Sequence, residues 1–518
     1  MVIIATSYRE NLGNGTENRP RTIQVNITGG TIMSEHTPYG FMPISSGEEL
    51  LRSYAPDIAN RAHVLEIMRE DSTDMHFDNY KKIAENMVDG RSRRKVLGIH
   101  DLEGYAGQFN SVIVSLNGPD AGASATNIVS ALRKQGISAI YRHDRLFDPD
   151  TGNLNLLPPT VGYIVVGKDG ITAYENDYQD HGVRNGYTSQ IDIQGTDSMT
   201  YAAAFLALRL PFKDYSVILV GSMLPMKTED SDAYNNLKAA LAVAQKGLPG
   251  TYVAINDGEV MRATRAFKTG PNTAGPNRPI GARTVPEKQS FESIHYPVLF
   301  NFSPNGSPDK GAMRKQVRFR ERSKERSEFF KDPERGLSDL YGGWPIYLDQ
   351  YEPVYVLDLH TNFEPDELDQ AFKDGYKAVV IKAAGTGGLF NTPKDRALVP
   401  KIKRFTDDGR FVAVTSRVLR AIVNKEYEVN RRSEEAGAVI CYDMHSELVI
   451  AKTELAAGIA DTPEDFRMFM LYNFEDEVNE DLIPPWERTT NDQLAEILKK
   501  AAPRQDKRNG NGHNGFRH

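Results

Sequence analysis

The sequence is poor in cysteine and tryptophan, and it lacks any long apolar run. Its 518 residues include one cysteine, Cys441, which excludes an internal disulfide and an all-cysteine zinc site. No apolar stretch approaches the ~20 residues that cross a bilayer. The first residues, MVIIATSYREN, have no basic n-region and no long h-region, so we expect no secretory signal. These absences favour a cytoplasmic protein with no membrane contact.

A strong positive charge is also absent. The chain has 62 Lys and Arg against 70 Asp and Glu, a formal net charge of −8, which argues against a nucleic-acid binder with a basic surface. Hydrophobic residues make up 40% and charged residues 25%, as in globular proteins. At roughly 150 residues per domain, the length predicts about three domains.

Short apolar strands alternate with single helices in two parts of the chain. We expect strands at 22–27, 190–194, 217–222, 251–256, 354–360, 378–383 and 411–416, and helices at 79–87, 231–246 and 393–406. Such alternation is typical of parallel sheets covered on both faces. The sequence therefore predicts two α/β domains with mostly parallel sheets.

The composition also suggests boundaries. We expect a flexible arm at 1–20, an N-terminal α/β domain at 21–300, a charged linker at 301–350, a C-terminal α/β domain at 351–460 and an extension at 461–518. Residues 314–335 mix charges of both signs, which is typical of a solvated helix or linker. Residues 504–518 are low in apolar content, so we expect disorder there.

Four short segments carry residues suited to chemistry. They are TGGTI at 28–32, DSTDM at 71–75, GTDSM at 195–199 and RATRAFK at 262–268. Taken singly, each has a structural explanation as a turn, a helix cap or a solvated loop. Taken together they suggest a site, because ligands of open α/β sheets bind at the carboxyl ends of strands, where Thr28 and Thr196 are expected.

The residue types at this edge suit acyl transfer. Threonine is a weak nucleophile that needs a nearby base. A desolvated lysine beside an aspartate can be that base, since burial and neighbouring charges tune a lysine. Backbone N–H groups at helix starts can hold an oxyanion. We therefore expect Thr28, Thr196, Asp197 and Lys268 to converge in one pocket.

With these segments the sequence resembles the bacterial-type L-asparaginase family, which includes the asparaginase-like subunit of a tRNA-dependent amidotransferase. The resemblance covers about 21–90, 190–300 and 350–455, and GFMPISSG and Asp443-Met444 bring it nearer the cytosolic type. Further matching stretches are VILVGSMLP, SDAYNNLKAA, AAGTGGLFN, VTSRV and YDMHSELVIAK. The resemblance implies an asparaginase-like N-terminal catalytic domain.

The resemblance also implies roles for individual residues. Thr28 matches the primary nucleophile, and Thr196 matches the second catalytic threonine, with Asp197 and Lys268 as its partners. The implied reaction is hydrolysis of the side-chain amide of L-asparagine, or of a related small amide, through a threonine acyl-enzyme. Neither a metal nor an organic cofactor is expected, and members of the family assemble as homodimers or homotetramers.

The resemblance further implies that Ser72 binds the substrate α-carboxylate, with Thr73 beside it, and that Asp197 also holds the α-amino group. The mobile-loop tyrosine of the family falls on Phe41, which has no hydroxyl, and Tyr39 is the candidate replacement. Gln194 stands where the family usually has histidine.

An insertion of about 91–188 separates the second and third segments. Strands are expected at 111–115 and 137–142, a helix at 124–135, and a hairpin from 160–166 and 170–174. We expect an ordered addition beside the active-site mouth or a subunit contact. The alternatives are a replacement for the family's usual strand before GTDSM and a remote surface decoration.

Two other functions remain open at this point. One is an amidotransferase subunit that releases ammonia for a partner protein. The other is a binding or regulatory protein on an asparaginase fold with weak turnover, because a fold does not determine a function.

Overall fold

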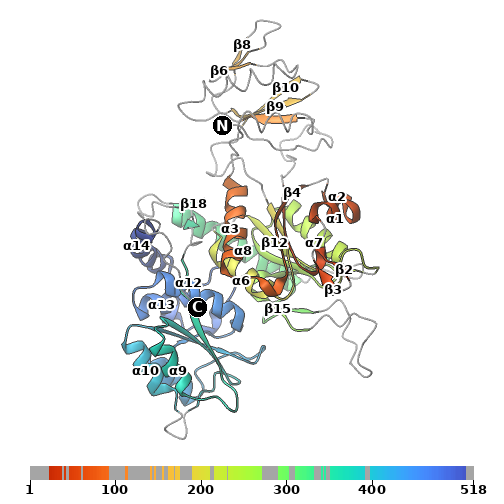
Figure 1. The fold of residues 1–518 in the computed structure, drawn as a ribbon. Coiled ribbons are helices and arrows are strands. Elements are labelled where there is room, and N and C mark those ends of the chain that lie inside the picture. The colour runs from red at the N-terminus through yellow and green to blue at the C-terminus, as the bar shows by residue number, and fades with distance from the viewer. Residues whose placement is uncertain are drawn as a thin grey trace. The chain divides into compact units, whose positions relative to one another are not determined.

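The computed structural model describes most of the chain beyond residue 22 (Figure 1). Two compact units are distinguished: Met1–Val25 with Ala59–Val64 and Asn86–Ser189, and Asn26–Ile58 with Leu65–Glu85 and Gln190–His518. The described residues are 23–37, 40–42, 46–59, 62–92, 111–114, 140–142, 145–147, 154–156, 161–167, 170–175, 189–210, 215–229, 231–270, 290–302, 310–331, 340–341, 344–345, 350–390 and 397–508.

Small antiparallel sheets make up the described part of the insertion, 93–188, which belongs to the first unit. One contains β5 (Ser111–Val114), β9 (Val161–Gly167) and β10 (Gly170–Glu175). The pairing of Gly167 with Gly170 confirms the hairpin expected there. The other contains β6 (Ile140–Arg142), β7 (Arg145–Phe147) and β8 (Leu154–Leu156). The helix expected at 124–135 lies outside the described residues, and the role of the insertion stays a prediction.

A seven-stranded sheet organises the N-terminal part of the second unit. Its order is β17-β14-β13-β12-β11-β1-β4; β12 and β13 are parallel, while β14 runs antiparallel to both β13 and β17. The bounds are β1 (Ile23–Gly29), β4 (Ala62–Glu70), β11 (Ser189–Ile193), β12 (Ser216–Val220), β13 (Gly250–Ile255), β14 (Glu259–Arg262) and β17 (Phe300–Asn301). All residues of β1, β11, β12 and β13 are buried, including the polar Asn26, Gln190 and Asp192 of β1 and β11.

Two side-chain contacts show that β1 and β11 run parallel. Asn26 Nδ2 donates to Gln190 Oε1 at 3.2 Å, and Thr28 Oγ1 donates to the Ile193 carbonyl at 2.8 Å. The partners are separated by 164 and 165 positions, and this separation stays nearly constant only when both strands advance in the same direction. The carboxyl ends of β1 and β11 therefore meet at one edge of the sheet.

Helices cover both faces of this sheet (Figure 1). α1 (Gly47–Tyr54) lies on the face of Ile27, since a Cβ on Gly47 would be 2.5 Å from Ile27 Cγ2. α7 (Ala233–Lys246) is drawn on that same side, and α3 (Phe77–Ser92) and α6 (Met199–Arg209) on the other. Aromatic rings join α3 to α6, with 5.1 Å between the centroids of Tyr80 and Tyr201. The short helix α2 (Pro56–Ala59) follows α1.

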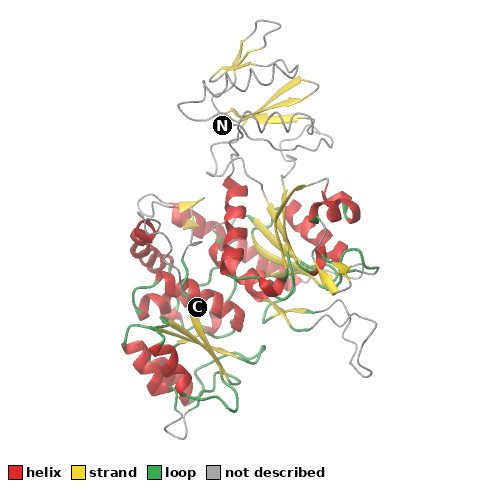
Figure 2. Cartoon of the chain, viewed as in Figure 1, coloured by secondary structure: helices red, strands yellow, loops and turns green. Residues whose placement is uncertain are grey.

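A four-stranded parallel sheet organises the C-terminal part. Its order is β20 (Val354–Asp358), β21 (Ala378–Ala383), β22 (Phe411–Ser416) and β23 (Val439–Ile440). The expected α/β fold with mostly parallel sheets is thus confirmed, as the alternation of red helices and yellow strands in Figure 2 shows. The accompanying helices are α9 (Asp366–Lys373), α10 (Val399–Asp407), α11 (Glu428–Glu435), α12 (Ser446–Ile459) and α13 (Pro463–Leu471).

Two helices begin later than the sequence predicts. The one expected at 393–406 begins at Val399, because Pro400 occupies its first turn, where proline is favoured. The one expected at 231–246 begins at Ala233 with Asp232 as its N-cap residue. The Asp232 side chain makes no cap bond, since its carboxylate faces a neighbouring loop instead. The helix ends, as expected, at Gly247 in the left-handed region with φ of 56°.

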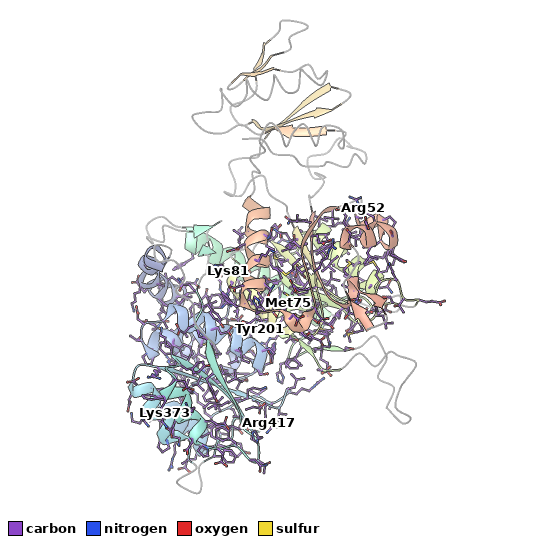
Figure 3. All side chains as sticks on the ribbon, viewed as in Figure 1. Arg52, Met75, Lys81, Tyr201, Lys373 and Arg417 are labelled. Carbon is purple, nitrogen blue, oxygen red and sulfur yellow. The ribbon has the colours of Figure 1, made fainter. Side chains whose placement is uncertain are left out.

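α6 and α12 join the two parts of the second unit. Ala204 and Leu208 of α6 belong to the same apolar core as the C-terminal sheet. The Tyr201 hydroxyl, labelled in Figure 3, donates to the Glu454 carboxylate, and the buried Arg209 donates to the Ala451 carbonyl at 3.4 Å. Cys441 is fully buried here, and burial raises the pKa of its thiol to about 12.

The charged segment is helical and anchored rather than a plain linker. α8 (Lys310–Lys331) buries Phe319, whose ring lies 3.9 Å from the Arg262 guanidinium carbon. α14 (Asn491–Arg508) reaches into the interval predicted to be disordered, so that prediction is wrong for 504–508, and the rest lies outside the described residues. Within the described ranges, no helix is both long and apolar enough to cross a membrane. The remaining strand pairs are β2 (Glu35–Thr37) with β3 (Gly40–Met42), β15 (Ala266–Lys268) with β16 (Phe291–Ser293), and β18 (Leu340–Tyr341) with β19 (Trp344–Pro345).

Candidate active site

The first segment turns sharply at the carboxyl end of β1. Gly29 and Gly30 have φ of 116° and 80°, values that residues other than glycine rarely adopt. The Gly30 N–H donates to the Glu70 carbonyl at 3.1 Å, and a Cβ on Gly30 would lie 2.2 Å from Gly195 Cα. Two glycines therefore bring the TGGTI and GTDSM segments into direct backbone contact.

Thr28 lies at this edge, one residue before the turn. Its side chain is buried, with 2% of the residue exposed, and its hydroxyl donates to the Ile193 carbonyl at 2.8 Å. The hydroxyl is thus oriented by the backbone of β11, whose next residues lead into GTDSM.

The third and fourth segments meet through one lysine. Lys268 Nζ lies 2.8 Å from Thr196 Oγ1 and 2.6 Å from Asp197 Oδ1. The backbone N–H of Lys268 donates to Thr200 Oγ1 at 3.0 Å, which fixes the end of β15 against the first turn of α6. Neither Thr196 nor Asp197 is the N-cap residue of α6; that position is Ser198.

The lysine also sets the charge of its partner. Burial alone would raise the pKa of Asp197, but the hydrogen bond and the positive charge of Lys268, with a hydrogen bond from Ser72, outweigh burial and lower it. Asp197 is therefore a carboxylate at neutral pH. Because 56% of its side chain is exposed, this carboxylate can meet a solute.

Ser72 joins the same network, whereas Thr73 does not. The buried Ser72 hydroxyl donates to Asp197 Oδ2 at 3.2 Å, and a Cβ on Gly195 would lie 2.3 Å from Ser72 Cβ. Thr73 is exposed, and its N–H and its hydroxyl both donate to Asp71 Oδ1. Asp71 thereby fixes the short 3-10 turn Ser72–Asp74, which is followed by Met75, labelled in Figure 3.

The RATRAFK segment is held by the C-terminal part. Arg265 Nη1 lies 2.9 Å from Asp443 Oδ2, and both side chains are buried. The Thr264 hydroxyl donates to the Glu475 carbonyl at 2.7 Å. The first contact connects RATRAFK with the YDMHS stretch and the second connects it with the segment after α13, links that the sequence alone does not reveal.

The sequence analysis also missed a set of hydrogen bonds that holds the loop 221–224, which packs against Thr196. The Asp232 carboxylate accepts from Met223 N at 3.0 Å and from Leu224 N at 3.3 Å, and Asn236 Nδ2 donates to the Gly221 carbonyl at 2.9 Å. A Cβ on Gly221 would lie 3.1 Å from Thr196 Cγ2. The sequence did offer a signal for these contacts: SDAYNNLKAA has more polar residues at the start of its helix than a single N-cap requires.

The candidate replacement for the loop tyrosine stays a prediction, because Tyr39 lies outside the described residues. Phe41 lies in β3, opposite His36 in β2. Among the described residues, no group of three or more His, Cys, Asp and Glu could hold a metal ion. The arrangement thus offers hydroxyls, a carboxylate and an ammonium, which can bind a charged amino acid and stabilise charge on oxygen.

Comparisons with known proteins match two stretches of the chain. The asparaginase N-terminal model matches residues 179–276, and the glutaminase/asparaginase C-terminal domain matches residues 353–470. The first range contains Thr196, Asp197 and Lys268, and the second contains the four-stranded sheet. Two parts of the chain thus match models of the asparaginase family, the family that the sequence resembles.

Individual relatives are similar over just over half of the chain. An L-asparaginase of Thermococcus kodakarensis is 27% identical over 293 residues, which cover 56% of this chain and 76% of that protein. A glutamyl-tRNA(Gln) amidotransferase subunit of Pyrococcus horikoshii is 26% identical over 301 residues. That match covers 57% of this chain but 60% of the relative, less than two thirds of its length.

Solved structures agree on the fold. The thermostable L-asparaginase from Thermococcus kodakarensis superposes with a TM-score of 0.53 at 20% identity, covering 88% of this chain and 99% of that one. At this identity the likeness supports the two-domain α/β fold alone.

Proposed function

We propose that the protein is an amidohydrolase that hydrolyses the side-chain amide of L-asparagine, or of a related small amide, to the acid and ammonia. The observation that carries the proposal is the double contact of Lys268 Nζ with Thr196 Oγ1 and Asp197 Oδ1. Thr28 lies next to the last residue of β1, at the same edge of the sheet. A hydroxyl, an ammonium and a carboxylate in contact suit acyl transfer.

In the proposed reaction, Thr28 Oγ bonds to the amide carbon, and its proton is transferred through a base to the amide nitrogen. The bond from carbon to nitrogen then breaks, ammonia leaves, and Thr28 carries the acyl group. Water hydrolyses this ester and restores the hydroxyl. Thr196 activates the second nucleophile, the water that hydrolyses the ester. Lys268, which donates to Thr196 Oγ1, stabilises negative charge on that oxygen during this step.

Substrate binding is proposed to use the exposed Asp197 carboxylate. It is ionised at neutral pH, so it suits the α-ammonium group of an amino acid. Ser72, which donates to the other oxygen of Asp197, is then placed to donate to the α-carboxylate. Thr73 could contact the substrate only after its hydrogen bond to Asp71 is broken. Tyr39 remains the proposed replacement for the loop tyrosine that Phe41 lacks.

A second candidate is an amidotransferase subunit that passes ammonia to a partner protein. The similarity to the glutamyl-tRNA(Gln) amidotransferase subunit of Pyrococcus horikoshii favours it. Both candidates share the first half-reaction, and they differ in where the ammonia goes. A cytoplasmic location and a homodimeric or homotetrameric assembly belong to the first proposal.

The deciding experiment measures ammonia release by the full chain from L-asparagine, L-glutamine and short peptide amides, with Thr28→Ala as the variant. We expect the wild type to release ammonia from asparagine, and Thr28→Ala to lose on the order of hundredfold or more while it stays folded. No release from any amide by the isolated wild type would overturn the first candidate. Wild-type rates in Thr28→Ala would remove Thr28 from the mechanism.

A further inference from the structure

β11 contains a buried carboxyl group that the mechanism above does not use. Asp192 is 0% exposed, and neither of its oxygens has a hydrogen-bond partner among the described residues. Burial raises the pKa of this carboxyl to about 8. An unpartnered polar group in a core costs free energy, so its presence calls for an explanation.

The register of the sheet places Asp192 beside Thr28. Asn26 and Gln190 touch through their side chains, so they share one face of the neighbouring strands β1 and β11. Side chains alternate along a strand, so Thr28 and Asp192, each two residues further on, share that face as well. Parallel neighbours lie about 4.8 Å apart. The carboxyl therefore lies one strand away from the proposed nucleophile.

Few charged groups surround this position. β12, the other neighbour of β11, reads SVILV, and β1 contributes Asn26 and Thr28. Among the residues whose burial is described on the covering helices, the buried or half-buried titratable side chains are Tyr80 and Lys81 of α3, and Tyr201 and Arg209 of α6. Tyr201 is bonded to Glu454, and Arg209 to the Ala451 carbonyl.

Thr28 needs a proton acceptor that the described site does not otherwise supply. Its hydroxyl donates to the Ile193 carbonyl, which is no base. Lys268 and Asp197 are engaged with Thr196 and with each other. Phe41, at the position of the family's loop tyrosine, has no hydroxyl, and Tyr39, the proposed replacement, lies outside the described residues.

We propose that Asp192 is the proton acceptor for Thr28, an inference that rests on the proposed amide hydrolysis. The Thr28 hydroxyl turns from the Ile193 carbonyl to the Asp192 carboxylate. As Oγ bonds to the amide carbon, the bond from Oγ to hydrogen breaks and the proton moves to Asp192. When the bond from carbon to nitrogen breaks, the proton passes to the departing nitrogen, so ammonia leaves and the carboxylate is restored.

The test follows the reactivity of the Thr28 hydroxyl with a fluorophosphonate, measured by peptide mass spectrometry between pH 6 and 9, beside ammonia release from asparagine. We expect wild-type labelling to rise with pH through about 8, as the carboxylate forms. Asp192→Asn should label about a hundredfold more slowly at pH 9 and lose this rise. Asp465→Asn, which alters a buried carboxyl in α13, is the matched control and should follow the wild type.

Two outcomes would overturn the inference. One is equal labelling rates and pH profiles for the wild type and Asp192→Asn. The other is a wild-type Thr28 that is not labelled at all, or whose labelling rate does not change between pH 6 and 9. This second outcome overturns the inference even if the Asp192→Asn variant does not fold. Labelling needs no turnover, so a failure of the ammonia assay and a failure of Asp192 are distinguishable.

Discussion

Arg265 and Asp443 form a buried ion pair at 2.9 Å across 178 positions of sequence. Arg265 lies three residues before Lys268, and Asp443 lies directly before the stretch that leads into α12. The position of the lysine at the site thus depends on the C-terminal part, although no C-terminal residue touches the lysine in the described network.

This pair should be strongly coupled. Asp443→Leu leaves the Arg265 guanidinium buried without its charge partner, so we expect it to lower the free energy of unfolding by about 3–5 kcal/mol. The double variant Arg265→Leu with Asp443→Leu should recover part of this loss, because no isolated charge remains. Urea unfolding of the four proteins in the cycle measures the coupling. Additive losses would mean that the two side chains do not interact.

Lys268→Met should reduce ammonia release by on the order of hundredfold, because it removes the donor to Thr196 Oγ1 and Asp197 Oδ1. The unfolding temperature should change little, since the side chain serves the site rather than a core. Lys238→Met, at an exposed position on α7, is the control and should keep wild-type activity. A fully active Lys268→Met variant would exclude the lysine from the reaction.

The same substitution should change the pH dependence of substrate binding. Lys268 lowers the pKa of Asp197, so its loss raises that pKa. A carboxyl with a raised pKa is protonated at higher pH, and the acid-side rise in KM for an amino-acid amide should therefore begin at higher pH than in the wild type. KM measured between pH 4 and 8 checks this. An unchanged acid limb would mean that Asp197 does not hold the ammonium group.

Gly30→Ala should damage the site more than backbone strain alone explains. Its Cβ would lie 2.2 Å from Gly195 Cα, and its φ is 80°. Gly409→Ala is the matched control, because Gly409 has φ of 76° but no heavy atom of the described residues within 4 Å of the added Cβ. We expect the control to lose about 1 kcal/mol of stability and no activity, and Gly30→Ala to lose both. Equal effects would mean that the two loops can separate freely.

The ionisation of Asp192 should make stability depend on pH. Its pKa is about 8 in the folded chain against 3.8 for an exposed group, so the folded state binds the extra proton between these values. The contribution of the neutral carboxyl to stability is full below about pH 3.8 and is lost as pH rises to about 8. Asp192→Asn should therefore lose less stability than the wild type from pH 5 to 8, as measured by urea unfolding. Parallel curves would exclude a buried titrating carboxyl.

The sequence predicted those strands and helices whose limits are set by the residues of the segment itself. The strands 378–383 and 411–416 match the structure to the residue, because each is an apolar run between polar turns. The start of α7 was placed too early, because Asp232 bonds to the backbone of another loop instead of capping its own helix. Helix propensity at the N-terminus of α7 does not predict a side-chain contact with a loop nine residues earlier.

The candidate site divides in the same way. Thr196, Asp197 and Lys268 could be named from their segments, and the structure brings them together. Thr73 was expected beside Ser72, but its hydroxyl is bonded to Asp71. Asp192 was not singled out within the strand expected at 190–194, because its lack of a hydrogen-bond partner among the described residues becomes visible only once its neighbours are placed. The Arg265–Asp443 pair needed the tertiary fold for the same reason.

The burial of Cys441 has a practical consequence for labelling. A thiol with no exposed surface and a pKa of about 12 forms almost no accessible thiolate at neutral pH. The native thiol therefore does not need to be removed before labelling with a maleimide. One cysteine introduced at an exposed position, for example Val317 or Tyr427, would carry a fluorophore or spin label. Distances between such labels could then follow the charged helix α8 and the C-terminal part in solution.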